Sequence, residues 1–210
     1  MKQYVYIKSW NGFSPSHLKN KTDLSDHYKK FYNLKKEVLN IDDNWLISKK
    51  LVAEDLASLM KSHKNILSNG CGRGIVEEFI LKKMDNDVFI HGIDPYIDKN
   101  SQKESINLKL EKGSIFDMKL SKFDIVYMNT VDYCLTDFEY GRVCKRLSEL
   151  SKNGLILSQL MPPDLNYLFS LKYRISTFIK SLPFTPYVFW GWHRSIDEHI
   201  NILRNIGFKR

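Results

Sequence analysis

The stretch Leu67-Ser68-Asn69-Gly70-Cys71-Gly72-Arg73-Gly74 decides the fold of this chain. It is a glycine-rich turn between an apolar run typical of a strand and an amphipathic run typical of a helix. Glycine is favoured where the backbone needs a positive φ or must approach a ligand closely. Because three glycines alternate here, Cys71 and Arg73 are the side chains left in the tightest part of the turn. The turn therefore predicts a place where backbone meets a ligand.

Short apolar runs alternate with amphipathic runs on both sides of this turn. The apolar runs span residues 65–69, 88–93, 123–128 and 154–160. Apolar residues recur at helical spacing in 48–62, in 74–83, in 138–151 and from Ser195 onward. This order predicts an α/β fold with a doubly wound, mostly parallel sheet that is covered on both faces. Such sheets bind ligands outside the carboxyl ends of their strands, with the first strand-to-helix turn as the usual floor.

Helical spacing also predicts which side chains face the core. In the helix over 48–62, the inward residues are Leu51, Val52, Leu56 and Leu59. In the helix over 74–83, Ile75, Phe79 and Ile80 lie on one side, and the other side carries Glu77, Glu78, Lys82 and Lys83. Asp197 and Glu198 suit the positive end of a final helix that starts at Ser195, and Gly207 suits its end.

Length and composition are those of a globular protein. With 210 residues, 43% of them apolar or aromatic, the chain can bury a core as one domain with an appended lid. No apolar run is long enough for a signal peptide or a membrane span, so the sequence predicts a cytoplasmic protein. The three cysteines are too few and too irregularly spaced for a disulfide framework or a zinc site. We expect thiols and no bound metal.

The net charge of +8 is unevenly distributed along the chain. Residues 1–64 hold 12 basic and 7 acidic side chains, residues 65–158 hold 13 and 14, and residues 159–210 hold 7 and 3. If the two basic flanks fold over a site, they favour an anionic ligand. The alternative, which is more common, is that they are solvated faces.

The glycine spacing excludes two nucleotide motifs. A dinucleotide site needs G-x-G-x-x-G, whereas the third glycine here is Gly74 and Ile75 follows it. A triphosphate loop needs G-x-x-x-x-G-K-[ST], which does not occur. The pattern is instead G-x-G-x-G, which is typical of another cofactor class.

The segment 65–160 resembles the class I S-adenosylmethionine-dependent methyltransferases, which implies a Rossmann-like methyltransferase fold. The glycine turn stands where this family holds the methionine end of its cofactor. The run Ile90-His91-Gly92-Ile93-Asp94 is similar to the second strand, which ends in an acid that accepts hydrogen bonds from both ribose hydroxyls. The run 112–117 is similar to the loop beside the adenine. The run 123–129 resembles the fourth strand, and 131–137 resembles the loop under the methyl-transfer site.

The resemblance implies S-adenosylmethionine as the cofactor and a set of residues that bind it. They are Asn69, Gly70, Cys71, Gly72, Gly74, Asp94, Pro95, Ser114, Ile115 and Asn129. For Asn129 a strand-end cap is a close alternative, and Asp117 is a second candidate for the adenine amino group. Many family members carry an acid at the positions of Ser68 and Ser114, so we expect modest cofactor affinity.

Two residues are predicted to act on the methyl acceptor. Tyr133 stands where many members of the family carry histidine, and it forms either a wall of the acceptor pocket or a general base, the wall being preferred because a tyrosine ionises near pKa ~10. His193 is an imidazole close to the predicted mouth of the site, where it could take a proton from an acceptor hydroxyl. Its alternative is a surface or capping residue.

The resemblance also implies four segments within one structural domain. Residues 1–64 form a helical segment flanking the site, 65–160 the cofactor-binding core, 161–194 an aromatic lid and 195–210 the final helix of the core. The lid has cations at its rim, which are Lys172, Arg174, Lys180 and Arg194. The sequence stops where the sixth strand of the family would begin, so we expect a sheet without the usual last strands or one completed in another way.

Three functions remain open from the sequence. The first is O-methylation of a small molecule or glycan, which the aromatic lid favours. The second is methylation of nucleic acid, which the basic flanks support, although the fourth strand ends in Met128-Asn129-Thr130 and not in an Asn-Pro-Pro-Tyr-like tetrad. The third is a non-catalytic or regulatory S-adenosylmethionine-binding protein, which Ser68 and Ser114 suggest. The acceptor and the oligomeric state are left open.

Overall fold

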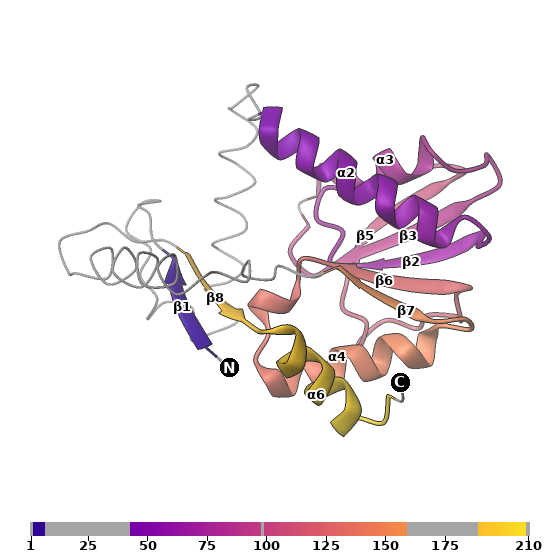
Figure 1. Ribbon diagram of the computed structural model, residues 1–210. Coiled ribbons are helices and arrows are strands. Elements are labelled where there is room, and N and C mark those ends of the chain that lie inside the picture. The colour runs from indigo at the N-terminus through magenta and orange to yellow at the C-terminus, as the bar shows by residue number, and fades with distance from the viewer. Residues whose placement is uncertain (1, 7–42, 98, 159–188, 209–210) are drawn as a thin grey trace. The chain divides into compact units, whose positions relative to one another are not determined.

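The computed structural model describes residues 2–6, 43–97, 99–158 and 189–208 (Figure 1). They belong to two compact units. The first, here called the sheet unit, comprises residues 43–97, 99–130 and 142–158. The second, here called the ribbon unit, comprises residues 2–6, 131–141 and 189–208.

The sheet unit is built on six strands in the order β4-β5-β3-β2-β6-β7. They are β2 (Asn65–Asn69), β3 (Phe89–Asp94), β4 (Lys103–Glu104), β5 (Leu108–Lys112), β6 (Ile125–Asn129) and β7 (Leu155–Ser158). The short edge strand β4 is antiparallel to β5, and the other neighbouring pairs are parallel. Figure 1 shows α2 (Asp43–Met60) and α3 (Ile75–Leu81) on one face of the sheet and α4 (Asp137–Leu150) on the other. The predicted doubly wound, mostly parallel α/β fold is confirmed.

Strand order reverses beside β2, and this places the carboxyl ends of three strands together. From β2 the chain continues to β3 and β5 on one side and then returns to β6 and β7 on the other. Asn69 at the end of β2 is in register with Ile93 of β3 and with Met128 of β6. Asp94 directly follows Ile93, and Asn129 directly follows Met128. The polar residues Asn69, Asp94 and Asn129 therefore lie together at one edge of the sheet. We call this the carboxyl edge.

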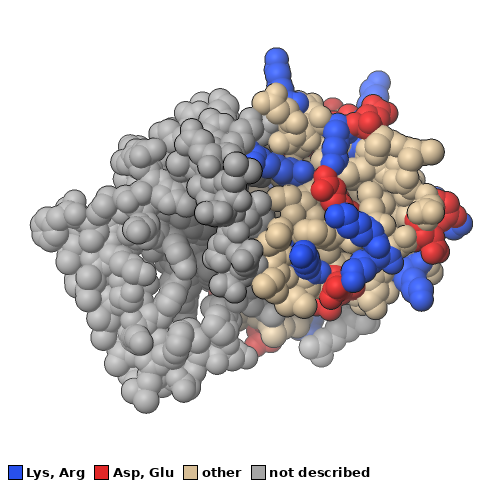
Figure 2. Space-filling model, turned by 90° about the horizontal axis from the view of Figure 1, so that it is seen from above, with Lys and Arg blue, Asp and Glu red and all other residues tan. Residues whose placement is uncertain are grey.

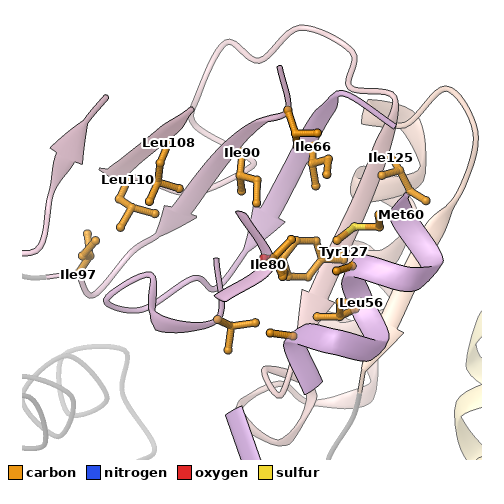
Figure 3. Packing of buried hydrophobic residues seen from close by; sticks show 14 residues of the cluster. Leu56, Met60, Ile66, Ile80, Ile90, Ile97, Leu108, Leu110, Ile125 and Tyr127 are labelled. Carbon is orange, nitrogen blue, oxygen red and sulfur yellow. The ribbon is translucent and has the colours of Figure 1, made fainter. Parts of the chain in front are cut away.

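The core of the sheet unit fills the space between the sheet and the two helices α2 and α3 (Figure 3). Side chains from the strands, such as Ile66, Ile90 and Tyr127, belong to the same buried cluster as Leu56 and Met60 of α2. The opposite face is buried as well, through Leu67, Val126, Met128, Val143, Leu147 and Leu150. Burial on both faces explains why these strands read as continuous apolar runs.

Two sequence-based expectations differ from the structure. Leu51 and Leu59 of α2 are 57% and 64% exposed, because the buried stripe consists of Ala53, Leu56, Ala57 and Met60. The small alanines let the helix approach the sheet, whereas the spacing of the leucines predicts a different buried stripe. The strand β5 was missed, because its buried Leu108 and Leu110 alternate with charged residues in a run of only five.

The surface over α2 and α3 carries charges of both signs. Seen from that side, Figure 2 shows Lys and Arg interspersed with Asp and Glu over the described residues. Lys83 of the α3 end pairs with Glu54 of α2 at 2.7 Å, and Lys103 pairs with Glu78. This arrangement is that of a solvated, locally paired face.

The ribbon unit contains an antiparallel pair of strands, β1 (Lys2–Tyr6) and β8 (Phe189–His193). It also contains the 3-10 helix η2 (Asp132–Cys134), the first turn of α4 and the helix α6 (Ile196–Asn205). α6 starts with a capping box, in which Ser195 and Glu198 each accept from the other's backbone N–H. Gly207, at φ 99°, follows its end as predicted. The strand β1 lies in the segment predicted to be helical.

Within the described residues, the six-stranded sheet ends at β7, and β8 pairs with β1 instead of extending it. This agrees with the expected lack of the usual last strands. Most of the predicted lid, residues 161–188, lies outside the described residues. The four segment boundaries stay a prediction. In the described ranges no helix is both long enough and apolar enough to cross a membrane.

The two leucines of α2 test the observed buried stripe. Leu56 is 2% exposed, so we expect Leu56→Ala to lower the free energy of unfolding by about 2–4 kcal/mol through lost burial and a residual cavity. Leu51→Ala makes the same chemical change on an exposed position and should change it by about 0.5 kcal/mol or less. Urea denaturation of both variants measures the difference. Equal losses would mean that α2 packs through the face predicted from the sequence.

Candidate functional site

The glycine turn after β2 adopts the left-handed backbone that its sequence predicts. Gly70, Gly72 and Gly74 have φ values of 80°, 55° and 77°. Residues with a Cβ rarely adopt this conformation, so each position needs glycine. At Gly74 there is also no room, because a Cβ would stand 2.3 Å from the Leu110 side chain.

Hydrogen bonds fasten this turn to the end of β3. The N–H groups of Gly70 and Cys71 donate to the carbonyl oxygen of Ile93 at 2.8 and 3.3 Å. The N–H of Gly72 donates to Asp94 Oδ2 at 3.0 Å. The backbone of the turn is therefore fixed against the strand that carries the predicted ribose-binding acid.

Asp94 is a buried carboxylate whose partners are backbone N–H groups. Besides Gly72, the N–H of Tyr96 donates to Oδ1 at 2.7 Å. Burial raises the pKa of Asp94, and the N–H groups of Tyr96, Gly72 and Ile97 oppose that shift. A carboxylate offers about four acceptor positions. Asp94 can therefore hold the turn and still accept hydroxyl donors from a ligand.

All ten residues predicted to bind the cofactor lie at or directly after the carboxyl ends of β2, β3, β5 and β6. Asn69 and Asn129 are the last residues of β2 and β6, and both are half-buried. Ser114 accepts the Phe116 N–H at 3.3 Å, so it forms a local turn. The structure thus brings these residues to one edge, and their contact with a cofactor stays a prediction.

Two of the ten residues differ from the others in burial or in role. Ile115 is buried among core residues, and its carbonyl oxygen accepts from Arg146 Nε at 3.2 Å. Pro95 is exposed. For Ile115 the structure leaves mainly backbone to meet a ligand.

The residue after Asn129 has a strained backbone. Thr130 is β-branched, yet its φ is 55°. Its N–H donates to the Ser158 carbonyl oxygen at 2.7 Å, and its hydroxyl donates to Asn129 Oδ1 at 2.9 Å. Such outliers cluster at functional sites, and this one directly follows β6 at the carboxyl edge.

A buried carboxylate behind the turn was missed in the sequence. Glu77 of α3, predicted to be exposed, is only 2% exposed. Its Oε1 accepts from Ser68 Oγ at 2.6 Å and from the Tyr127 hydroxyl at 2.7 Å. The acid that Ser68 lacks is therefore supplied by the neighbouring helix. The sequence signal was the position of Glu77 one helical turn before Ile80, on the same inward face.

The ribbon unit holds the two residues predicted to act on the acceptor. Tyr133 is half-buried in η2. His193 is the last residue of β8, where its backbone pairs with Lys2 of β1. Their predicted roles in methyl transfer stay predictions.

Arg194 does not lie at the rim of a lid, and that prediction is wrong. It is fully buried in the ribbon unit and is bound to the segment that follows β6. Its Nε donates to Asp137 Oδ1 at 2.7 Å, and its terminal nitrogens donate to the carbonyl oxygens of Asp132 and Leu135 at 2.8 and 2.5 Å. A buried guanidinium with these acceptors fixes the shape of the loop that contains Tyr133. The other three predicted rim cations lie outside the described residues.

His199 of α6 is a buried imidazole near this arginine. Its Nε2 lies 3.8 Å from Asp132 Oδ2, and its ring packs edge-on against Tyr140 at 5.3 Å between centroids. Burial, followed by the charge of Arg194, lowers the pKa of His199 to about 4, although Glu198 and Asp137 oppose the shift. His199 is therefore neutral at pH 7.

No family model matches this sequence, and no curated protein matches it. Several solved structures are similar to it. The magnesium protoporphyrin IX methyltransferase from Synechocystis PCC 6803, with bound SAH, is 16% identical, with 90% of each chain covered and a TM-score of 0.64. The mitomycin 7-O-methyltransferase is 12% identical over 92% of this chain and 62% of that chain, with a TM-score of 0.57. Human N-acetylserotonin methyltransferase, in complex with SAM, is 16% identical over 88% and 51%, with a TM-score of 0.56. The chain thus has the class I methyltransferase fold.

His199 makes stability depend on pH. Its pKa is near 4 when folded and about 6.5 when unfolded, so the unfolded chain binds more protons between these values and stability falls as the pH drops through this window. We expect the free energy of unfolding of the wild type, relative to His199→Phe, to fall by up to about 3 kcal/mol from pH 6.5 to pH 4. Denaturation at several pH values measures this difference. Ile202→Ala, a non-titrating change on the same helix, should give a difference from the wild type that does not vary with pH. A flat profile for His199→Phe would contradict the burial of a neutral imidazole.

Proposed function

We propose that this chain binds S-adenosylmethionine at the carboxyl edge and transfers its methyl group to an oxygen of a small molecule or a glycan. The observation that carries the proposal is the left-handed glycine turn whose Gly72 N–H is held by Asp94 at 3.0 Å. It joins a glycine-rich backbone turn to a buried acid at the end of the next strand.

The residues at this edge fit such a cofactor. Three glycines with positive φ give the turn few side chains, which favours close approach of a ligand to its backbone. Asp94 keeps acceptor positions for the two hydroxyls of a ribose. Asn69 and Asn129 bring amide groups to the same edge, where they can bind the polar methionine end.

Methyl transfer from a sulfonium requires few catalytic groups of the protein. When bound, the cofactor supplies an electrophilic methyl group on a sulfonium. The protein has to hold the acceptor oxygen in line and, where the oxygen carries a proton, to remove it. In this proposal His193 is the base and Tyr133 forms a wall of the acceptor pocket, with its loop fixed by Arg194.

The choice of acceptor has two supports. The mitomycin 7-O-methyltransferase, one of the structural neighbours, is named for methylation of an oxygen on a small molecule. The basic flanks of the chain, with 12 lysine and arginine residues against 7 acids in residues 1–64, favour an anionic acceptor. Both supports are independent of the glycine turn, so the donor and the acceptor can be tested separately.

Calorimetric titration with S-adenosylmethionine tests the donor site. We expect Asp94→Ala to abolish detectable binding, because it removes the ribose acceptor and frees Gly72. Asp124→Ala is the matched control, since Asp124 also accepts a backbone N–H, that of Asn65 at 3.0 Å, but at the amino end of β2. This control should bind like the wild type.

A second variant in the same titration changes the turn itself. Valine at position 72 would have to adopt a φ near 55°, so Gly72→Val should also abolish binding while circular dichroism shows a folded chain. Unchanged affinity in both Asp94→Ala and Gly72→Val would refute the site. No binding by the wild type at millimolar ligand would refute the function.

The base is tested by the pH profile of turnover. The assay uses a phenol as methyl acceptor, chosen because the wild type forms S-adenosylhomocysteine with it. As the pH increases, we expect kcat/KM of the wild type to rise through a pKa near ~6.5, because an imidazole loses its proton there. His193→Ala should lose this limb, and Tyr133→Phe should retain it. An unchanged profile in His193→Ala would rule out this residue as the base.

A further inference from the structure

Directly behind the glycine turn, four elements of the sheet unit meet at one carboxylate. Ser68 of β2 and Tyr127 of β6 are register partners on adjacent strands. Both side chains point to the face that α3 covers, and both hydroxyls donate to Oε1 of Glu77 at 2.6 and 2.7 Å. From α2, Lys49 lies close enough for the charge of Glu77 to act on its ammonium group.

The hydrogen bonds of Glu77 favour a negative charge behind the glycine turn. Two hydroxyl donors on one oxygen favour the ionised carboxyl group. Burial raises the pKa of Glu77, and the charge of Asp94 adds to that shift, but the two hydroxyls oppose it.

Glu77 lies directly behind the glycine turn, because its Oε1 accepts from the hydroxyl of Ser68, two residues before Gly70. The pKa of the Cys71 thiol lies well above its usual value, first because of burial and next because of the charge of Glu77. Asp94, which accepts the Gly72 N–H at 3.0 Å, is a second carboxylate at the same turn. A ligand on this turn therefore meets a buried negative field that solvent screens only weakly.

We propose that Glu77 is a specificity-determining residue that makes the carboxyl edge prefer the positively charged sulfonium donor over the neutral thioether product. The inference rests on the proposed function. S-adenosylmethionine and S-adenosylhomocysteine share their adenosine, amine and carboxylate groups and differ by the methyl group and its positive charge. A buried anion that touches neither ligand separates them by this charge alone, which favours donor entry and product release.

The test is the ratio of two dissociation constants measured by calorimetry, that of S-adenosylhomocysteine over that of S-adenosylmethionine. Glu77→Gln keeps the shape of the side chain and an oxygen that accepts both hydroxyls, but it removes the charge. A unit charge within about 10 Å, at an effective dielectric constant of about 20, changes a binding constant by roughly tenfold. We therefore expect the ratio to fall about tenfold in Glu77→Gln.

Three controls separate charge from structure. Glu78→Gln makes the same change on the neighbouring residue, which is exposed, and should leave the ratio unchanged. Tyr127→Phe removes a hydrogen bond without removing charge, so it should change both dissociation constants in parallel. Lys49→Gln removes a positive charge near Glu77, so it should raise the ratio.

The outcomes distinguish this inference from the proposed function. If Glu77→Gln binds both ligands with the wild-type ratio, or weakens both equally, Glu77 is structural and the inference is wrong while the donor site stands. If the wild type binds neither ligand, the proposed function fails first. A double variant, Ser68→Asp with Glu77→Gln, returns a carboxylate to the same place and should restore the wild-type ratio.

Discussion

The hydrogen bonds between the glycine turn and the end of β3 are the constraint on which the site depends. Through Ile93 and Asp94, β3 accepts three consecutive N–H groups of the turn, those of Gly70, Cys71 and Gly72. Three left-handed glycines make this path of the backbone possible. The turn thus becomes a rigid floor at the point where strand order reverses, which is where open α/β sheets bind their ligands.

In each of its two units the chain buries ionisable groups that make hydrogen bonds. Asp94 accepts backbone N–H groups, Glu77 accepts two hydroxyls, and Arg194 donates to a carboxylate and two carbonyl oxygens. Burying a charge without partners would be costly, so such groups persist where a site needs a fixed field or a fixed loop. Two of them lie at the carboxyl edge, and the third shapes the loop of Tyr133.

The regular elements could be predicted from the sequence because one physical signal dominates in each. The apolar run over 65–69 coincides with β2, and the capping residues before α6 behave as their types predict. Asp94 could be placed at the carboxyl edge because it directly follows a buried run. The glycine spacing gave the conformation of the turn, since few other residues adopt a positive φ.

The errors arose where tertiary packing overrides the local pattern. Alanines, not the leucines at 51 and 59, form the buried stripe of α2, because close approach to the sheet favours small side chains. Glu77 was predicted on the outer side of its helix and Arg194 at the rim of the lid, whereas their partners come from strands and loops far along the chain. Single-residue polarity carries no information about such partners. Within the described residues, the parts of the site that the sequence missed are buried polar groups.

The most direct test of the central claim is the response of the glycine amides to S-adenosylmethionine. In an isotopically labelled chain, nuclear magnetic resonance follows the backbone N–H signals of Gly70, Gly72 and Gly74 during a titration. Binding at the carboxyl edge predicts that these three signals shift to saturation, while Gly154, at the amino end of β7, keeps its position. Unshifted signals in the turn, or a saturating shift confined to other parts of the chain, would contradict it.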